Sequence, residues 1–341
     1  MSSSFWSGRP VLVTGATGLL GGWLVAALLR CGSRVVVLVR DSAPESAFVR
    51  NGWMSSVPAV YGSVTDLDLM RRVLAEYSVE TIFHLAAQTQ VGVAKVDPVG
   101  TLEANVRGTW NVLEAARQCG GVPVIAASSD KAYGASDQLP YSEDHPLRGK
   151  YPYDVSKSCM DLICSMYAAS FALPVAIVRC ANLFGGGDLN FARAIPGVIR
   201  STLRGEPFVI RSDGKFIRDY LYVEDAVDGY LRVAERLADE PALAGEAFNL
   251  SAGDSRTVLE MVHTVLQLLD RTDLEPIIMN LASNEIREQA LSGDKARRVL
   301  GWNPQFRLND ALKRTIEWYQ AYFTAGREGQ RVVAYAAASI I

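Results

Sequence analysis

A glycine-rich turn that directly follows a short apolar run is the feature that most restricts the fold of this chain. The run covers residues 11–14, and the turn continues as GATGLLG from Gly15 to Gly21. Glycines at such a turn let the backbone approach a pyrophosphate, and the N-terminus of the following helix supplies N–H donors and a partial positive charge. The whole uncharged stretch, residues 11–29, is long enough for a membrane span, but its glycines favour a strand, a turn and a helix. We therefore predict a phosphate-binding turn, although its G-x-x-G-x-x-G spacing is one residue longer in the first gap than the usual dinucleotide fingerprint.

The N-terminal half of the chain alternates short β-branched runs with amphipathic stretches of helical period. Strands separated by single helices predict βαβ units, whose right-handed crossovers build a parallel sheet covered on both faces. The fold class that follows is α/β, a doubly wound, Rossmann-like parallel sheet with a smaller C-terminal lobe for the substrate. The expected strands are residues 11–14, 34–39, 59–63, 81–86, 122–127 and 175–179, and the expected helices are residues 19–31, 66–77, 99–119 and 154–171.

The pattern changes after Phe184, where three consecutive glycines interrupt the alternation. Beyond them we expect helices at residues 192–203, 223–237, 258–269 and 309–322, and strands at residues 208–211 and 247–250. We predict a dinucleotide-binding domain of residues 1–182, completed by residues 219–250, a substrate lobe of residues 183–218 and 251–325, and a tail of residues 326–341.

Composition restricts the partners and the compartment. The 341 residues carry a formal net charge of −3, with 34 Lys and Arg against 37 Asp and Glu, so there is no basic excess for binding nucleic acid. Five cysteines without metal-like spacing and three widely separated histidines indicate reduced thiols and no metal site. The apolar stretch at residues 332–341 is too short to cross a membrane, and the N-terminus lacks a signal-peptide pattern. We expect a cytoplasmic protein that binds neither nucleic acid nor membrane.

A tyrosine and a lysine share one face of the helix expected at residues 154–171. Tyr153 and Lys157 are four residues apart, and a lysine ammonium beside a phenol lowers the pKa of the phenol and makes it a usable base. Ser128 and Ser129 follow the strand expected at residues 122–127, at the sheet edge where such folds place their sites. A tyrosine and lysine at this spacing are common on helices, but together with the glycine turn and the serine they predict an active site.

Arg40 and Asp41 end the second expected strand, about twenty residues after the glycine turn. A carboxylate there can accept hydrogen bonds from the adenosine ribose, whereas an arginine can hold a 2′-phosphate. Both side chains also suit a solvated loop. We predict NAD as the cofactor, with NADP left open.

With these features in place, the sequence resembles the extended short-chain dehydrogenase/reductase family, and within it the nucleotide-sugar epimerases and dehydratases. The resemblance covers nearly the whole chain and is strongest to 4,6-dehydratases of the CDP-glucose type and, more distantly, of the GDP-mannose type. It implies a nicotinamide cofactor that is reduced and reoxidised within one turnover, a nucleoside-diphosphate sugar as substrate, and a homodimer. The segments that carry it are TGATGLLG (14–21), HLAAQ (84–88), SSDKAYG (128–134), YPYDVSK (151–157), RCANLFGGGDLN (179–190), IRDYLYVED (217–225) and KARRVLGW (295–302).

The resemblance assigns roles to the residues at matching positions. Tyr153 corresponds to the base that removes the proton of the sugar 4-hydroxyl, Lys157 supports it and the nicotinamide ribose, and Ser129 hydrogen-bonds the same hydroxyl. The family often has Asp, contacting adenine, where this chain has Ser63 followed by Val64, so the serine weakens that assignment. The other cofactor positions are Gly15, Thr17, Gly18, Leu19, Leu20, Gly21, Leu85 and Ala87.

Five polar residues are candidates for binding the substrate, and three of them match positions that hold it in the family. Asn182, Arg218 and Arg287 correspond to groups that bind the diphosphate, and surface or interlobe ion pairs are the alternative for the two arginines. Gln88 and Arg193 are expected to face the sugar or its phosphates. Arg193 also suits the carboxylate of a uronic acid, which would favour an epimerase.

Asp130 and Lys131 bear on the reaction itself. Once C4 of the sugar is a ketone, elimination of the 6-hydroxyl needs a base at C5 and an acid at O6. The resemblance places such a pair at these two positions in 4,6-dehydratases, and Asp-Lys is the pattern of the CDP-glucose type. We expect Asp130 to be the acid and a neutral Lys131 to be the base, with a loop ion pair as the alternative.

The predicted function is therefore a nucleotide-sugar 4,6-dehydratase, and a 4-epimerase that uses the same Ser129, Tyr153 and Lys157 is the alternative. A regulator that senses NAD without catalysis is a third class, because a fold does not determine a function. The complete set of serine, tyrosine and lysine argues against a regulator, which has no need of a base.

Overall fold

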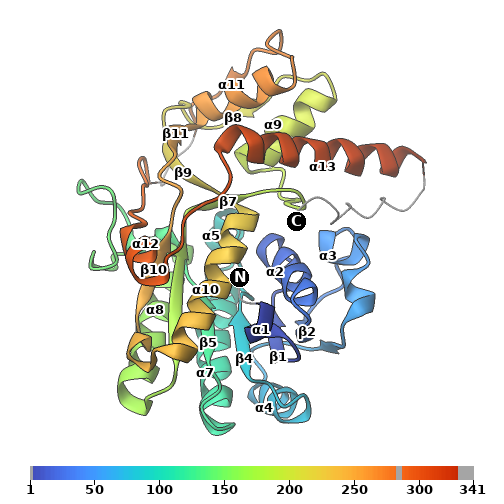
Figure 1. Cartoon of the computed structure of the whole chain (residues 1–341). Coiled ribbons are helices and arrows are strands. Elements are labelled where there is room, and N and C mark those ends of the chain that lie inside the picture. The colour runs from blue at the N-terminus through green and yellow to red at the C-terminus, as the bar shows by residue number, and fades with distance from the viewer. Residues whose placement is uncertain (1–2, 282–285, 329–341) are drawn as a thin grey trace.

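The computed structural model describes residues 3–281 and 286–328, and its centre is a seven-stranded sheet in the order β10-β6-β5-β4-β1-β2-β3 (Figure 1). Every neighbouring pair in this sheet is parallel. The predicted Rossmann-like α/β fold is confirmed. The strands are β1 (Pro10–Thr14), β2 (Arg34–Val39), β3 (Ala59–Tyr61), β4 (Thr81–His84), β5 (Val124–Ala127), β6 (Val175–Cys180) and β10 (Ala247–Leu250).

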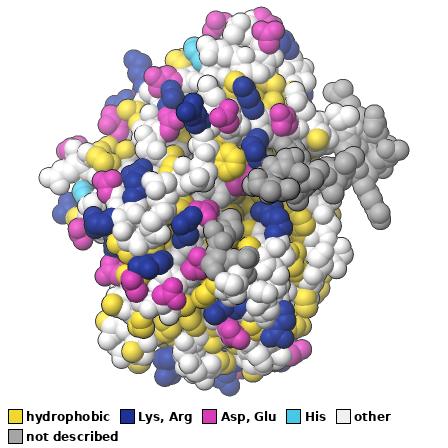
Figure 2. All heavy atoms as spheres, viewed as in Figure 1, with side chains coloured by type: hydrophobic (Ala, Val, Ile, Leu, Met, Phe, Trp, Pro, Cys, Tyr) yellow, Lys and Arg dark blue, Asp and Glu magenta, His cyan; other side chains and the backbone are white. Residues whose placement is uncertain are grey.

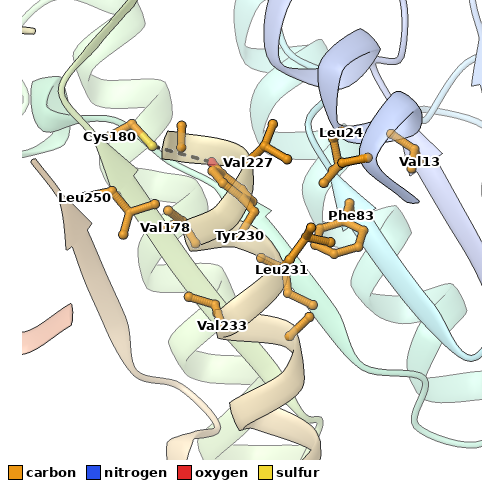
Figure 3. Close-up of a cluster of buried hydrophobic side chains, with 14 of the residues drawn as sticks. Val13, Leu24, Phe83, Val178, Cys180, Val227, Tyr230, Leu231, Val233 and Leu250 are labelled. Carbon is orange, nitrogen blue, oxygen red and sulfur yellow. Dashed lines mark hydrogen bonds between the residues drawn. The ribbon is translucent and has the colours of Figure 1, made fainter. Parts of the chain in front are cut away.

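Two hydrophobic cores cover the two faces of the sheet, because successive side chains of a strand point to opposite faces. Val11 and Val13 of β1 pack in one core, and Leu12 packs in the other. Figure 3 shows part of the first core, where Leu24 of α2 and Tyr230 of α10 lie against the sheet. The helices on that side are α2 (Leu19–Arg30) and α10 (Val223–Asp239), and those on the other side are α4 (Leu67–Glu76), α7 (Gly108–Gln118) and α8 (Pro152–Phe171).

The helix expected at residues 99–119 is interrupted in the structure. It consists of α6 (Pro98–Leu102), a wider π-helical turn at Glu103–Arg107, and α7. The buried side chain of Asn105 in this turn donates to Ser156 Oγ and to the Gln88 carbonyl, both at 2.9 Å. These long-range hydrogen bonds are not visible in the helical period, and π turns of this kind are frequent at functional sites.

The C-terminal half builds a smaller lobe around a third core, with α9 (Ala194–Leu203), α11 (Val258–Leu268) and α13 (Leu308–Glu328) (Figure 1). The sequence pattern did not predict the sheet of β7 (Asn182–Phe184), β9 (Ile217–Tyr222) and β11 (Ser255–Thr257), whose strands are short. β8 (Val209–Ile210) pairs with β12 (Ile277–Ile278), and the exact boundaries of the two domains stay a prediction. The remaining elements are α1 (Ser3–Trp6), α3 (Ala47–Arg50), α5 (Val91–Val96), α12 (Asp294–Leu300) and short turns at Trp53–Ser56, Asp130–Tyr133 and Pro241–Leu243.

Charged side chains of both signs are interspersed over the face of the molecule shown in Figure 2. Among the helices of residues 3–281 and 286–328, none is long and apolar enough to cross a membrane.

Candidate active site

A cavity of about 1980 Å³ lies at the carboxyl ends of the central strands, and its wall includes residues of the smaller lobe. We call it the interlobe cavity. Single small-molecule pockets measure roughly 300–1,000 Å³, so this cavity is large enough for two ligands. In open α/β sheets, ligands bind at this edge, where the strand order reverses.

The predicted phosphate turn lies in the wall of this cavity with the geometry that it needs. Gly15 has φ +75°, and a Cβ there would be 2.8 Å from the backbone nitrogen of Ala86. A Cβ on Gly21 would overlap the carbonyl oxygen of Gly15, so both positions require glycine. No side chain caps the N-terminus of α2 at Gly18, which leaves its first N–H groups for a ligand. The turn residues that line the cavity are Gly15, Thr17, Gly18, Leu19, Leu20 and Gly21, and they fit a dinucleotide pyrophosphate.

A buried histidine fixes the strand ends beside this turn. Thr109 donates to the Asn105 carbonyl, so its oxygen accepts from His84 Nε2 at 3.1 Å, and His84 Nδ1 accepts from Thr14 at 3.0 Å. The Thr14 oxygen in turn accepts from the backbone N–H groups of residues 85–86. Burial, with a smaller effect of the Lys157 charge, lowers the pKa of His84 to about 3. This histidine is therefore a neutral structural link between β1 and β4.

The expected ribose and adenine positions also line the interlobe cavity. Arg40 and Asp41 form an ion pair with each other at 2.6 Å, and both side chains are about two-thirds exposed. Each side chain is thus already paired with the other, so this ion pair favours neither NAD nor NADP. The other predicted cofactor residues in the wall are Ser63, Val64, Leu85 and Ala87.

Ser129, Tyr153 and Lys157 come together in the wall of the interlobe cavity. The hydroxyl of Ser129 and the phenol of Tyr153 interact, since hydrogen bonding with Ser129 is the main effect that lowers the pKa of Tyr153. The structure thus places the serine at the end of β5 against the start of α8, as the sequence predicts. Their catalytic roles stay predictions.

The ammonium of Lys157 is held by neighbouring protein groups. It donates to the Ala127 carbonyl at 2.7 Å and contacts Met160 Sδ at 3.3 Å. Burial raises the pKa of Tyr153 above its usual value of 10. Burial lowers the pKa of Lys157 itself to about 8. Spacing on the helix predicts that Tyr153 and Lys157 share one face, but it does not predict the bond from Lys157 to the Ala127 carbonyl of β5.

A buried ion pair that no sequence pattern predicts contacts Ser128, the residue before Ser129. Arg179 and Asp161 pair at 2.7 Å with side chains 7% and 1% exposed. The Asp161 carboxylate also accepts from Ser128, which directly precedes Ser129. Arg179 further donates to the hydroxyl of Tyr133 at 2.7 Å. This network ties β6 and α8 to the end of β5, and removing one partner would leave an uncompensated buried charge.

Asp130 and Lys131 lie next to Ser129 in the cavity wall. Asp130 is 4% exposed, and its Oδ1 accepts from Ser129 at 3.0 Å. Its Oδ2 is buried and has no hydrogen-bond partner among the described residues. The Lys131 ammonium donates to the side chain of Gln289, a residue that no sequence motif marks.

Three of the five predicted substrate residues lie in the wall of the interlobe cavity, and two do not. Asn182, Arg193 and Arg218 line the interlobe cavity, and the buried amide nitrogen of Asn182 has no partner among the described residues. Gln88 and Arg287 are not part of that wall. The functional assignments of all five stay predictions.

The contacts of these side chains differ in kind. Arg193 is bound to Asp188 and to the Leu183 carbonyl, both at 2.6 Å. Gln88 bonds its own loop through the Gln90 carbonyl at 2.9 Å. Arg287 forms an exposed ion pair with Asp213 at 3.1 Å, as the alternative interpretation expected.

Comparison with known proteins agrees with this geometry. The sequence profile of the NAD dependent epimerase/dehydratase family matches residues 11–251, and the chain belongs to this family. It is 31% identical over 336 residues to a CDP-glucose 4,6-dehydratase of Salmonella typhimurium, which covers 94% of this chain and 93% of that protein. It is 33% identical over 315 residues to a UDP-glucose 4-epimerase of Mycolicibacterium smegmatis, which covers 91% and 98%.

A solved structure shows the same fold. The dTDP-glucose 4,6-dehydratase of Streptomyces venezuelae, solved with NAD, has a TM-score of 0.84 and 27% identity, and the match covers 94% of this chain and 98% of that one. The predicted family resemblance and fold class are thus confirmed.

Proposed function

We propose that this protein is an NAD-dependent nucleotide-sugar 4,6-dehydratase, which converts a nucleoside-diphosphate hexose into the 4-keto-6-deoxy sugar. The observation that carries the proposal is the placement of Asp130 and Lys131 beside Ser129 in the wall of the interlobe cavity. A second acid–base pair in this position suits an elimination, which needs groups beyond those that oxidise C4. The similarity to dehydratases of CDP-glucose and dTDP-glucose supports it.

Oxidation at C4 uses the serine, tyrosine and lysine. Tyr153 takes the proton of the 4-hydroxyl while Ser129 holds that hydroxyl in place. Lys157 orients the nicotinamide ribose and adds positive charge near the phenol. The glycine turn would hold NAD, which would supply the acceptor for the hydride of C4 and later the hydride donor for C6.

Elimination uses Asp130 and Lys131. The amine of Lys131 takes the proton from C5, and the electron pair of the broken C5–H bond forms the double bond between C5 and C6. The C6–O bond breaks at the same time, and the leaving hydroxide takes a proton from Asp130 and departs as water. When the hydride returns to C6, Lys131 gives its proton back to C5, so the substrate loses one water with no net oxidation.

A 4-epimerase remains the second candidate, because the similarity to a UDP-glucose 4-epimerase is as high as that to the dehydratase. It would use the same Ser129, Tyr153 and Lys157, and its reaction would not need Asp130 and Lys131 as acid and base. A regulator without catalysis is disfavoured, since all three oxidation residues lie in one cavity wall.

We further propose that the protein is a cytoplasmic homodimer. Apolar side chains are exposed on helices that pack together on one face of the sheet, with Trp110 of α7 at 42% exposure and Leu162 and Met166 of α8 at 62% and 44%. Exposed apolar patches of this kind mark protein interfaces. A second copy of the chain would cover them.

The test is incubation of the purified protein with CDP-, GDP-, UDP- and dTDP-linked hexoses, followed by mass spectrometry. The proposal predicts that one of these substrates loses one water. An unchanged mass with altered NMR couplings of the sugar would identify an epimerase and contradict the proposal.

A further inference from the structure

Gln289 is a fully buried polar residue, with 0% of its surface exposed. Its carboxamide oxygen accepts a hydrogen bond from the Lys131 ammonium. Its amide nitrogen has no hydrogen-bond partner among the described residues. Buried amides in native structures normally satisfy both groups, so one that makes a single side-chain bond needs an explanation. That single bond goes to a side chain in the wall of the interlobe cavity.

The backbone on both sides of Gln289 is fixed. The Gln289 N–H donates to the Ile217 carbonyl at 3.2 Å, and the Ile217 N–H donates to the Arg287 carbonyl at 2.9 Å, so the segment runs beside β9. On its other side, the Tyr141 N–H donates to the Ala290 carbonyl at 2.8 Å. These bonds leave the segment little freedom, so the Gln289 carboxamide is held in a fixed position next to Lys131.

We propose that Gln289 is a positioning residue for Lys131. The carboxamide oxygen of Gln289 holds the Lys131 nitrogen in place for removal of the C5 proton. This inference rests on the proposed dehydration. Lys131 lines the interlobe cavity whereas Gln289 does not, so Gln289 lies behind Lys131 and would act through the lysine.

An amide suits this role better than a carboxylate would. A neutral oxygen fixes the direction of the lysine side chain without adding a negative charge beside it. A carboxylate at the same place would favour the ammonium form, which cannot accept a proton. The base that takes the C5 proton must be the neutral amine, and the amide leaves that form accessible.

Other titratable groups lie around Asp130 and Lys131, and they are the same in every variant at position 289. Burial raises the pKa of Asp154 on α8, and the charge of Lys131 acts against that rise. Asp130, next to Lys131 in the same turn, adds to the effect of burial in raising the pKa of Tyr141, of Tyr153 on α8 and of Asp219 on β9, while Arg218 acts against the rise at Tyr141. A difference between two variants at position 289 therefore reports on the Gln289–Lys131 contact.

The first experiment measures Lys131 directly, in the full-length protein without substrate. An amine-selective acylating reagent labels lysines in their neutral form, and peptide mass spectrometry gives the labelling rate of Lys131 against pH. In Gln289→Glu, we expect the labelling midpoint to move up by about 1–3 pH units, since an opposite charge within hydrogen-bond distance shifts a pKa by that much. Gln305→Glu places the same change on an exposed side chain outside the cavity and should leave the midpoint where it is.

The second experiment follows the reaction, with whichever of the CDP-, GDP-, UDP- or dTDP-linked hexoses the wild-type protein turns over fastest. In Gln289→Glu, the pH profile of dehydration should move to higher pH by the same amount as the labelling midpoint. Gln289→Met has a similar volume, no charge and no acceptor for the ammonium. It should reduce elimination at least tenfold while NADH still forms at the wild-type rate, which a general loss of folding would not do.

The outcomes separate this inference from the proposed function. If wild-type protein dehydrates its substrate while Gln289→Glu moves neither the labelling midpoint nor the pH profile, Gln289 has no positioning role. If the labelling midpoint moves but wild-type protein releases no dehydrated product, the proposed function fails, and the base role of Lys131 fails with it.

Discussion

The proposed dehydration needs Lys131, whereas the alternative 4-epimerisation does not. Oxidation at C4 needs only Ser129, Tyr153 and Lys157, so Lys131→Ala should still transfer a hydride to the cofactor. It should then stop, because the C5 proton has no base. We expect NADH absorbance to build up in a single turnover with Lys131→Ala.

Tyr153→Phe is the matched control for this prediction. Loss of a general base costs about 10²–10⁴-fold in rate, so this variant should form no NADH on the same timescale. An epimerase would reduce its ketone again without Lys131, and turnover of Lys131→Ala at the wild-type rate would make Asp130 and Lys131 a structural pair.

Asp219 gives a prediction about stability. It is fully buried, and burial raises the pKa of its carboxyl to about 7. Between about pH 4 and pH 7 the folded protein therefore holds a proton that the unfolded chain has lost, so stability falls as the pH rises through this window. From pH 5 to pH 8 this group should lower the free energy of unfolding by about 2–3 kcal/mol.

Asp219→Asn should abolish that loss. The amide oxygen can still accept from Ser251 and from the Leu291 N–H, which both bond Asp219 Oδ2. Urea unfolding at pH 5 and pH 8 measures the difference, and Asp68→Asn changes an exposed carboxylate as the control. Equal pH dependence in wild type and Asp219→Asn would contradict the assignment.

The glycine turn between β1 and α2 is the element that we expect to bind the cofactor. Gly15→Ala forces a side chain into positive φ and against the backbone of Ala86, so we expect a loss of NAD binding of at least tenfold together with lower stability. Gly8→Ala also lies at positive φ, +72°, but has nothing within 4 Å of its Cβ. Calorimetric titration with NAD should separate the two variants, and equal affinities would show that the turn does not hold the cofactor.

The elements of this fold differ in how much their sequence reveals. The β1 strand, the glycine turn and the start of α8 are local patterns, and the structure has them where the sequence predicts them. β9 and the Gln289 segment depend on contacts between distant parts of the chain. Lys131 and Gln289 are 158 residues apart, and a lone glutamine in an irregular segment carries no local signal. Arg287 shows the opposite case, since its motif resemblance does not bring it into the cavity wall.

At the scale of the whole molecule, the predicted homodimer explains the exposed apolar side chains of α7 and α8. Leu162→Glu places a charge on that surface and should convert a dimer into a monomer without loss of NAD binding. Light scattering after size exclusion measures the mass. Tyr61→Glu, at a 65% exposed position on β3, serves as the control. A wild-type protein of monomer mass at micromolar concentration would contradict the dimer.

The interlobe cavity joins the dinucleotide turn of one lobe to polar groups of the other, and we propose that an elimination occurs between them. A nucleoside-diphosphate hexose with deuterium at C4 tests this elimination. We expect a product that has lost one water and carries the deuterium at C6, because the hydride taken from C4 returns to C6. A product of unchanged mass with deuterium still at C4 would contradict it and assign the protein to the epimerases.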